Sequence, residues 1–290
     1  MLLIFISGVF DDFRPMSPRY KLLTQIIAAF LVVIPGYTFR SVFFIDFGIL
    51  GNLNWLRYPL TMLWIVGLTN AVNLIDGVDG LAGGVSALVS IFFALIFVFI
   101  ANNSVMALIC LCLASALGGF LIFNMPFPRA KIFMGDGGSQ FLGFILALLP
   151  LVHAGGEPIP LLYAAALLSI PIFDTIAAIW RRLREGRRID RPDRLHIHHK
   201  LLNLGLSTRV VDGVLYGLQI VLGVLVFESM RIKGLRSLIF LGAAYLTTTG
   251  FFAAIHFVNR HVAYSRVKQK RRKLSSKASA HSIGFPSEEG

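Results

Sequence analysis

The sequence predicts an all-α protein, a polytopic bundle of transmembrane helices. Of its 290 residues, 56% are hydrophobic and only 14% are charged, against about 25% charged in an average soluble domain. Apolar runs of about 20 residues, the length that a helix needs to cross a bilayer, recur along the chain. Basic residues gather in alternate connecting loops, as in multi-pass membrane proteins. The net charge of +12 therefore needs no nucleic acid to explain it, and we expect none as a partner.

The first apolar segment predicts a partial helix rather than a span. MLLIFISGVF is about half the length that a span requires, and it runs straight into Asp11 and Asp12. It has no basic start and no small-residue cleavage site, so it does not resemble a signal peptide. We interpret it as the end of a transmembrane helix, which leads us to expect that the chain begins late.

About eight full spans are expected after this segment. The stretch TFRSVFFIDFGILGNLNW alternates weakly and contains glycines, which predicts a short hairpin on the outer face. Residues 1–260 thus form one transmembrane domain, and residues 261–290 form a basic, disordered tail that lies on anionic headgroups. The expected spans are 20–36, 57–73, 84–101, 105–124, 138–153, 159–180, 211–228 and 236–259.

The loops divide the basic residues unequally between the two membrane faces. The loops on one side, taken with the tail from residue 260, hold 22 of the 27 Lys and Arg residues, and the other side holds five. The positive-inside rule makes the first set cytoplasmic. The acidic residues at the ends of spans follow the same parity, as do three histidines. The residues concerned are Asp11, Asp12, Asp76, Asp79, Asp136, His196, His198 and His199.

Two of the acidic motifs carry paired carboxylates. Asp11 and Asp12 are neighbours, and neighbours on a helix point about 100° apart, so the two cannot share one role. Asp76 and Asp79 in IDGVDGLAGG lie at i and i+3, one above the other if helical, and Asn73 extends the polar face. Solvation of a helix end and N-capping are the competing explanations.

The remaining motifs carry an aspartate among glycines and a histidine cluster. Asp136 in FMGDGGSQ precedes a span, where an acid at a helix N-terminus suits a divalent ion with phosphate nearby, although an N-cap explains it equally well. The loop RIDRPDRLHIHHKLL is dense in Arg, Asp and His. Its spacing matches no common structural zinc site, and its basic character, including Arg194, favours a phosphate or nucleotide, although a loop that is basic only for topology remains open.

Five carboxylates at one membrane surface repel each other unless cations neutralise them. Hard oxygen ligands and glycine-rich loops favour Mg²⁺, with Mn²⁺ as its substitute, together with phosphates. The sequence therefore predicts phosphoryl transfer between a soluble nucleotide substrate and a lipid.

The motifs resemble those of the polyprenyl-phosphate N-acetylhexosamine-1-phosphate transferases (glycosyltransferase 4 type). The resemblance covers residues 7 to about 210 and rests on four blocks in the family's order, namely GVFDDFRPMSPRYKLLTQ, NAVNLIDGVDGLAGG, FMGDGGSQFLG and IPIFDT…PDRLHIHHKLLNLGLS. It implies transfer of a sugar-1-phosphate from a UDP-N-acetylhexosamine to undecaprenyl phosphate, with release of UMP. It further implies Mg²⁺ dependence and a cytoplasmic site in the bacterial inner (plasma) membrane.

The forms PDRLHIHH and IPIFDT resemble the branch that transfers N-acetylglucosamine-1-phosphate for O-antigen, enterobacterial common antigen or teichoic-acid linkage. The alternative is the branch that transfers phospho-N-acetylmuramoyl-pentapeptide in peptidoglycan synthesis. A homodimer is one expected assembly.

The resemblance also implies roles for single residues. Asp11 positions or activates the lipid phosphate, and Asp12 supports it near the metal. Asp136 is a metal ligand, with Asp12 and Asn73 beside it. Asp76 and Asp79 shape the nucleotide-sugar site. The sugar-phosphate portion is expected at His196, His198 and His199, and further substrate contacts at Lys21, Asn73 and Arg194.

Three points remain open at the level of sequence. Family members have about two further helices before the paired aspartates, so an inactive, N-terminally truncated homologue is an alternative, and we expect impaired activity if this is the true product. A transporter is disfavoured because the acids cluster at span ends rather than at the bilayer midplane. Asp174 lies within a span, where we expect a structural or supporting role, with Arg181 as the suggested partner.

Overall fold

A computed structural model of the chain describes residues 1–41, 45–125, 129–152, 159–188 and 195–282. Within these ranges Leu50, Asn52 and residues 263–282 are described by their backbone alone. The described residues form helices without a strand, and one isolated bridge joins Ser41 to Asp46. The predicted all-α class is therefore confirmed for the described part of the chain.

The helices are, in chain order, α1 (Leu2–Phe13), α2 (Pro18–Val33), the 3₁₀-helix η1 (Phe47–Leu56), α3 (Arg57–Ile75), α4 (Leu81–Phe99), α5 (Ser104–Asn124), α6 (Gly135–Leu148), the 3₁₀-helix η2 (Leu149–Leu151), α7 (Leu161–Leu167), α8 (Ser169–Arg184), α9 (Ile197–Asn203), α10 (Thr208–Arg231) and α11 (Leu235–Ser282).

Several helices are long and apolar enough to cross a membrane. Five in the described part of the chain meet that test by length and composition, and a sixth span results if α7 and α8, bent by 86° at their junction, are one broken span. The chain is thus a multi-pass membrane protein. Each predicted span contains a helix, but α2 has 16 residues and α6 has 14, both short of a full crossing. The number eight stays a prediction.

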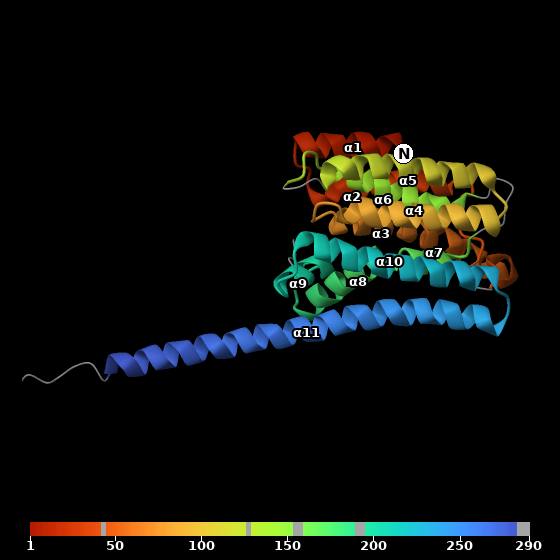
Figure 1. Cartoon of the computed structure of the whole chain (residues 1–290). Helices are drawn as coiled ribbons and strands as arrows, with labels where there is room; N and C mark the ends of the chain where they lie inside the picture. Colours follow the sequence, from red (N-terminus) through yellow and green to blue (C-terminus); the bar gives the residue numbers. More distant parts are fainter. Residues whose placement is uncertain (42–44, 126–128, 153–158, 189–194, 283–290) are drawn as a thin grey trace, which may run out of the picture.

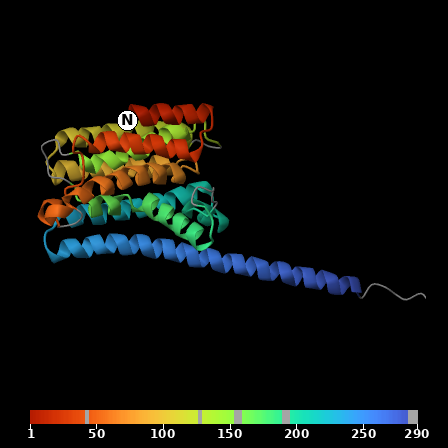
Figure 2. The same cartoon turned by 180° about the vertical axis from the view of Figure 1, so that it is seen from behind.

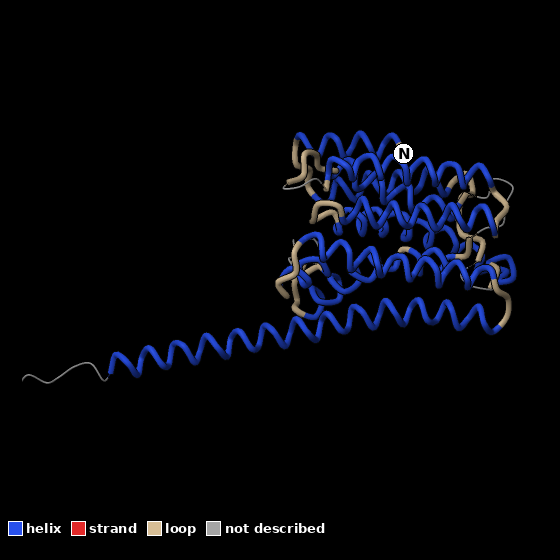
Figure 3. The backbone as a smooth tube through the Cα atoms, viewed as in Figure 1, coloured by secondary structure: helices blue, strands red, loops and turns tan. Residues whose placement is uncertain are grey.

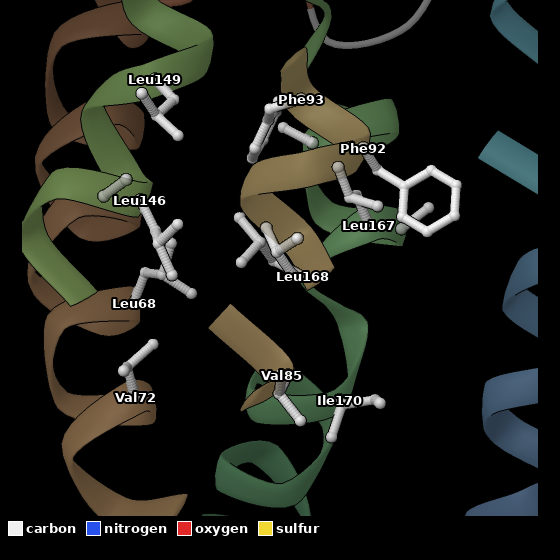
Figure 4. Close-up of a cluster of buried hydrophobic side chains, with 14 of the residues drawn as sticks. Leu68, Val72, Val85, Phe92, Phe93, Leu146, Leu149, Leu167, Leu168 and Ile170 are labelled. Carbon is white, nitrogen blue, oxygen red and sulfur yellow. The ribbon is translucent and has the colours of Figure 1, made fainter. Parts of the chain in front are cut away.

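Helix α4 forms the centre of the bundle, and 78% of its 18-residue apolar stretch is buried. Figures 1 and 2 show α1, α2, α5 and α6 on one side of it and α10 and α11 on the other. The core lies where α3, α4, α6 and the α7–α8 bend meet (Figure 4). Its labelled side chains include Leu68, Val72, Val85, Phe93, Leu146, Leu149, Leu167, Leu168 and Ile170, which exclude water through the middle of the bundle.

Two peripheral segments were expected beside the helical bundle. Residues 42–44 of the expected outer hairpin lie outside the described residues, Ser41 and Asp46 on either side of them form an antiparallel bridge, and the Asp46 side chain caps η1 by accepting from Gly48 N at 2.6 Å. The tail predicted to be disordered from residue 261 continues α11 as a helix to Ser282, beyond the end of the bundle (Figure 3). Residues 283–290 lie outside the described part.

Candidate active site at one end of the bundle

The residues of the four sequence motifs gather at a single end of the bundle, which we call the motif end. It comprises the α1–α2 connection, the α3–α4 turn, the start of α6, and α9 (Figure 1). The opposite end, where α10 turns into α11, is the far end.

Lys21 on α2 ties two carboxylates together at the motif end. Its ammonium group pairs with Asp11 Oδ2 and lies 2.6 Å from Asp136 Oδ2. Asp11 is buried, and its other oxygen accepts a hydrogen bond from Met16 N at 2.6 Å. The consecutive helices α1 and α2 and the distant helix α6 therefore meet at one cation. Two carboxylates this close need such a charge between them.

Asp12 caps the N-terminus of α6. Its Oδ1 accepts from Asp136 N at 2.7 Å and its Oδ2 accepts from Gly137 N at 3.1 Å. Gly135 has φ +69°, and a Cβ there would lie 2.8 Å from Asp12 Oδ2. The GDGG sequence is thus explained by a left-handed turn and a close carboxylate. Asp11 and Asp12 do have different partners, as their separation on a helix predicts. The metal-ligand role of Asp12 stays a prediction.

Asp136 is the most heavily contacted of the predicted site residues. Asn73 Nδ2 donates to Asp136 Oδ1 at 2.9 Å and to Ser139 Oγ at 2.8 Å. Burial, the largest influence, acts to raise the pKa of Asp136, but the hydrogen bonds from Lys21 and Asn73 and the charge of Lys21 hold that pKa at about 2. Asp136 is therefore ionised throughout the neutral range, as a ligand for a cation or a partner for a base must be.

The α3–α4 turn brings two more carboxylates to the same place. Asp76 is the C-cap of α3, with φ −76° and ψ 53°, and Gly80, at φ 90°, precedes α4. The condition for stacking Asp76 on Asp79, a continuous helix, is not met, because the intervening residues form a turn. Both carboxylates instead line a cavity of about 320 Å³, whose wall is formed by Asp76, Gly77, Val78, Asp79, Asn124, Phe133, Met134, Gly135 and Asp136.

The carboxylates of Asp76, Asp79 and Asp136 share this cavity, and their mutual repulsion helps to raise the pKa of Asp76. Burial, followed by the charges of Asp136 and Asp79, raises the pKa of Asp76 to about 6. Such a wall of hard oxygen donors fits Mg²⁺, which keeps several of its waters and takes one or two carboxylates from a protein. No group of three or more His, Cys, Asp or Glu side chains among the described residues forms a ready metal cage.

The histidine motif packs directly on the α3–α4 turn. His198 is 1% exposed, and a Cβ on Gly77 would lie 2.7 Å from His198 Nε2. The rings of His196 and His198 are stacked with centroids 6.0 Å apart, and those of His198 and His199 are 4.3 Å apart. Burial, then the neighbouring His199, lowers the pKa of His198 to about 4, so this ring is neutral at pH 7. Arg194 lies outside the described residues.

Asp174 on α8 holds the histidine motif in place. Its Oδ2 lies 2.8 Å from His196 Nδ1, and its Oδ1 accepts from Ile197 N at 2.8 Å. The expected supporting role therefore agrees with its contacts, but they are to the histidine motif rather than to the suggested Arg181.

Sequence reasoning missed three residues at the motif end. Asn124 Oδ1 accepts from Gly80 N at 2.6 Å, and Tyr216 Oη donates to Gly80 O at 2.5 Å, so both fix the turn that carries Asp79. Asp212 on α10 is 1% exposed, and neither carboxylate oxygen has a hydrogen-bond partner in the described structure. Asn124 at the end of an apolar run was a readable signal, whereas single polar residues inside α10 were not.

The fold and the site together define a class of protein: a multi-pass membrane protein with a carboxylate-rich, lysine-bridged cavity at one end of its helices. The comparison with known proteins agrees. The chain belongs to glycosyl transferase family 4, whose sequence profile matches residues 1–154.

Among its relatives, the probable undecaprenyl-phosphate N-acetylglucosaminyl 1-phosphate transferase of Bacillus subtilis (strain 168) is 40% identical over 218 residues, which is 74% of this chain and 60% of that protein. The decaprenyl-phosphate N-acetylglucosaminephosphotransferase of Mycobacterium tuberculosis (strain ATCC 25618 / H37Rv) is 35% identical over 234 residues, 72% of this chain and 57% of that protein.

The undecaprenyl-phosphate alpha-N-acetylglucosaminyl 1-phosphate transferase of Escherichia coli (strain K12) is 32% identical over 216 residues, covering 72% of this chain and 58% of that protein. The chain thus spans about three fifths of the length of these curated relatives.

Proposed function

We propose that the protein transfers N-acetylglucosamine-1-phosphate from UDP-N-acetylglucosamine to undecaprenyl phosphate and releases UMP. The observation that carries this proposal is that two of the motif blocks line one cavity and the other two blocks contact residues of its wall. Lys21 there bridges Asp11 and Asp136, and His198 lies against Gly77. The names of the relatives describe N-acetylglucosamine-phosphate transfer to polyprenyl phosphates, which supports the same reaction for this chain.

In the proposed reaction an oxygen of the lipid phosphate forms a bond to the phosphorus that carries the sugar. The bond between that phosphorus and the UMP oxygen breaks, and UMP leaves with the electron pair. Lys21 offsets the negative charge of the reacting phosphates, and Asp11 holds Lys21 and orients the lipid phosphate. Such positioning and charge stabilisation account for most of the catalysis in phosphoryl transfer.

The wall of the cavity supplies the groups for the nucleotide-sugar. Asp76, Asp79 and Asp136, with Asp12 and Asn73 beside them, would hold Mg²⁺ or Mn²⁺. The ion, when bound, neutralises charge that builds up on the diphosphate. Phe133 is 75% exposed on the same wall and offers an aromatic face on which a base can stack. His196, His198, His199 and Arg194 are assigned to the sugar-phosphate portion.

The proposal includes a membrane setting. Eight spans within residues 1–260 would put the motif end on the cytoplasmic side of a bacterial inner membrane, where 22 of the 27 Lys and Arg residues would lie. UDP-sugars are soluble, so the site must open to that side. Residues 261–290 would form a basic segment at the anionic leaflet, and a homodimer is the proposed assembly.

The test is a turnover assay in nanodiscs that contain undecaprenyl phosphate. Radiolabelled UDP-N-acetylglucosamine should yield UMP and a labelled lipid in equal amounts, only when Mg²⁺ or Mn²⁺ is present. Asp136→Asn should abolish both products. Asp46→Asn, which changes an exposed carboxylate away from the cavity, should not. Turnover of UDP-N-acetylmuramoyl-pentapeptide instead would identify the peptidoglycan branch, and no turnover of either donor would contradict the proposal.

A further inference from the structure

The histidine motif depends on a carboxylate that lies outside it. Asp174 is 2% exposed and lies in α8, where Thr175 beside it is the one other polar residue between Ile170 and Trp180. A buried carboxylate in such a place is costly unless it is paired and fully hydrogen-bonded. Both of its oxygens have partners, and both partners belong to the histidine motif 22 and 23 residues further along the chain.

The two contacts of Asp174 constrain different parts of the histidine motif, namely its backbone and one of its rings. The bond from Ile197 N to Asp174 Oδ1, at 2.8 Å, fixes where α9 begins. The bond between His196 Nδ1 and Asp174 Oδ2, also 2.8 Å, fixes the orientation of one ring. His196 is 5% exposed and its ring stacks on that of His198 with an interplanar angle of 6°. Asp174 thereby controls how the motif lies against Gly77 and the cavity.

We propose that Asp174 is a positioning residue, which holds His196 with its proton on Nδ1 and keeps Nε2 available as an acceptor. The assignment rests on hydrogen-bond chemistry. An ionised carboxylate only accepts hydrogen bonds, so the nitrogen of His196 that faces it must be the donor. When the ring is neutral, the other nitrogen then carries a lone pair and can take a proton or a hydrogen bond. The consequence of this arrangement for turnover rests on the proposed function; the tautomer itself does not.

The same chemistry predicts a specific effect of Asp174→Asn. The amide has one accepting oxygen and one donating nitrogen. If its oxygen accepts from Ile197 N, its NH₂ group must donate to His196 Nδ1, which therefore loses its proton to Nε2. The reverse orientation would set the NH₂ group against Ile197 N–H, two donors facing each other in a buried place, which is disfavoured. The substitution thus keeps the shape of the contact and inverts the tautomer.

The first experiment needs no variant. Solid-state ¹⁵N NMR of [¹⁵N]histidine-labelled protein in nanodiscs at pH 8 reads which ring nitrogen of each of the seven histidines is protonated. His196→Gln identifies the His196 signal. We expect His196 to be protonated at Nδ1, and protonation at Nε2 alone would overturn the proposal. This result does not depend on turnover, so it stands even if the proposed function fails.

The second experiment compares Asp174→Asn with Ser169→Ala. Ser169 begins the same helix, is equally buried, and bonds to Thr248 at 2.9 Å, away from the histidines. Asp174→Asn should move the His196 proton to Nε2 and lower kcat/KM for UMP release by about 10- to 100-fold. Ser169→Ala should leave the tautomer unchanged and kcat/KM within about twofold. An unchanged tautomer in Asp174→Asn, or equal losses of kcat/KM in both variants, would contradict the proposal.

Discussion

The two ends of the bundle use polar side chains in opposite ways. At the far end Ser229 and Ser237 exchange hydrogen bonds with each other's carbonyl groups at 2.6 and 2.7 Å, and Tyr163 joins Ser237 at 3.0 Å. These groups are neutral, buried and satisfied by their neighbours. At the motif end Lys21 lies between two carboxylates, and Asp76 and Asp79 face a cavity.

We infer from this difference that the polar groups at the far end hold helices together, whereas those at the motif end are suited to binding a charged ligand. A satisfied neutral cluster has no capacity left for a ligand, and its removal affects stability. A cluster of charges with raised and lowered pKa values retains strong interactions for a ligand of complementary charge. Substitutions at the motif end should therefore change turnover, and those at the far end should change stability.

The largest effect is expected from Asp136→Asn. It removes the charge that Lys21 and Asn73 hold and the carboxylate on the cavity wall, so we expect kcat/KM for UMP release to fall by roughly 10³-fold, several kcal/mol of charge stabilisation. The melting temperature should change little, because Asn keeps the shape. Turnover of this variant within tenfold of the unsubstituted protein would remove the basis for its assigned role.

A smaller effect is expected from Gly77→Ala. The new methyl group would lie 2.7 Å from His198 Nε2, so the turn or the histidine motif must shift. We expect kcat/KM to fall about 10- to 100-fold, since a displacement near 1 Å is enough for such a loss.

Gly67→Ala on α3 is the matched control, because a Cβ there meets nothing within 4 Å. Equal turnover in the two variants would show that the close packing of Gly77 on His198 has no role in the reaction.

Ser237→Ala reverses the pattern at the far end. It removes the hydroxyl that bonds to Tyr163 Oη and donates to Ser229 O, so the free energy of unfolding should fall by about 1–3 kcal/mol. kcat/KM should stay within twofold. Thermal unfolding followed by tryptophan fluorescence measures the first quantity, and a loss of turnover at temperatures where the variant is folded would break the contrast between the two ends.

The smallest effect concerns His198 and pH. Because the folded-state pKa is lowered to about 4, below the ordinary value of 6.5, protonation opposes folding. Its contribution to stability is complete above pH 6.5 and is lost as pH falls toward 4. The His198 ring should thus stay neutral between pH 6 and 8, as its ¹⁵N signals would report. A ring that titrates near pH 6.5 would contradict the buried position against Gly77.

The sequence predicts well which residues gather at the motif end, because the alternation of spans and loops indicates which loops lie on the same side of the membrane. Span parity placed Asp11, Asp76, Asp136 and His198 at one surface, and the structure brings them together. The start of α6 was only approximately readable, since the predicted span 138–153 begins three residues after Gly135.

The lateral contacts were not predictable. Hydropathy indicates which segments cross the membrane but not which helix faces which, so the packing of Gly77 on His198 and the partner of Asp174 came only from the structure. Single polar residues inside apolar helices, such as Asp212 and Tyr216, gave no signal for the same reason. The i, i+3 spacing of Asp76 and Asp79 would stack them only in a helix, and the residues between them form a turn that ends at Gly80, whose φ is 90°.

The central claim is that separated acidic turns form one site for a divalent ion and a diphosphate. Electron paramagnetic resonance of Mn²⁺, titrated into the protein in nanodiscs with UDP-N-acetylglucosamine present, tests it most directly. We predict one bound ion per chain with magnetic coupling to ³¹P, lost in Asp136→Asn and retained in Asp46→Asn. Mn²⁺ that stays free, or that binds equally well to both variants, would contradict the claim.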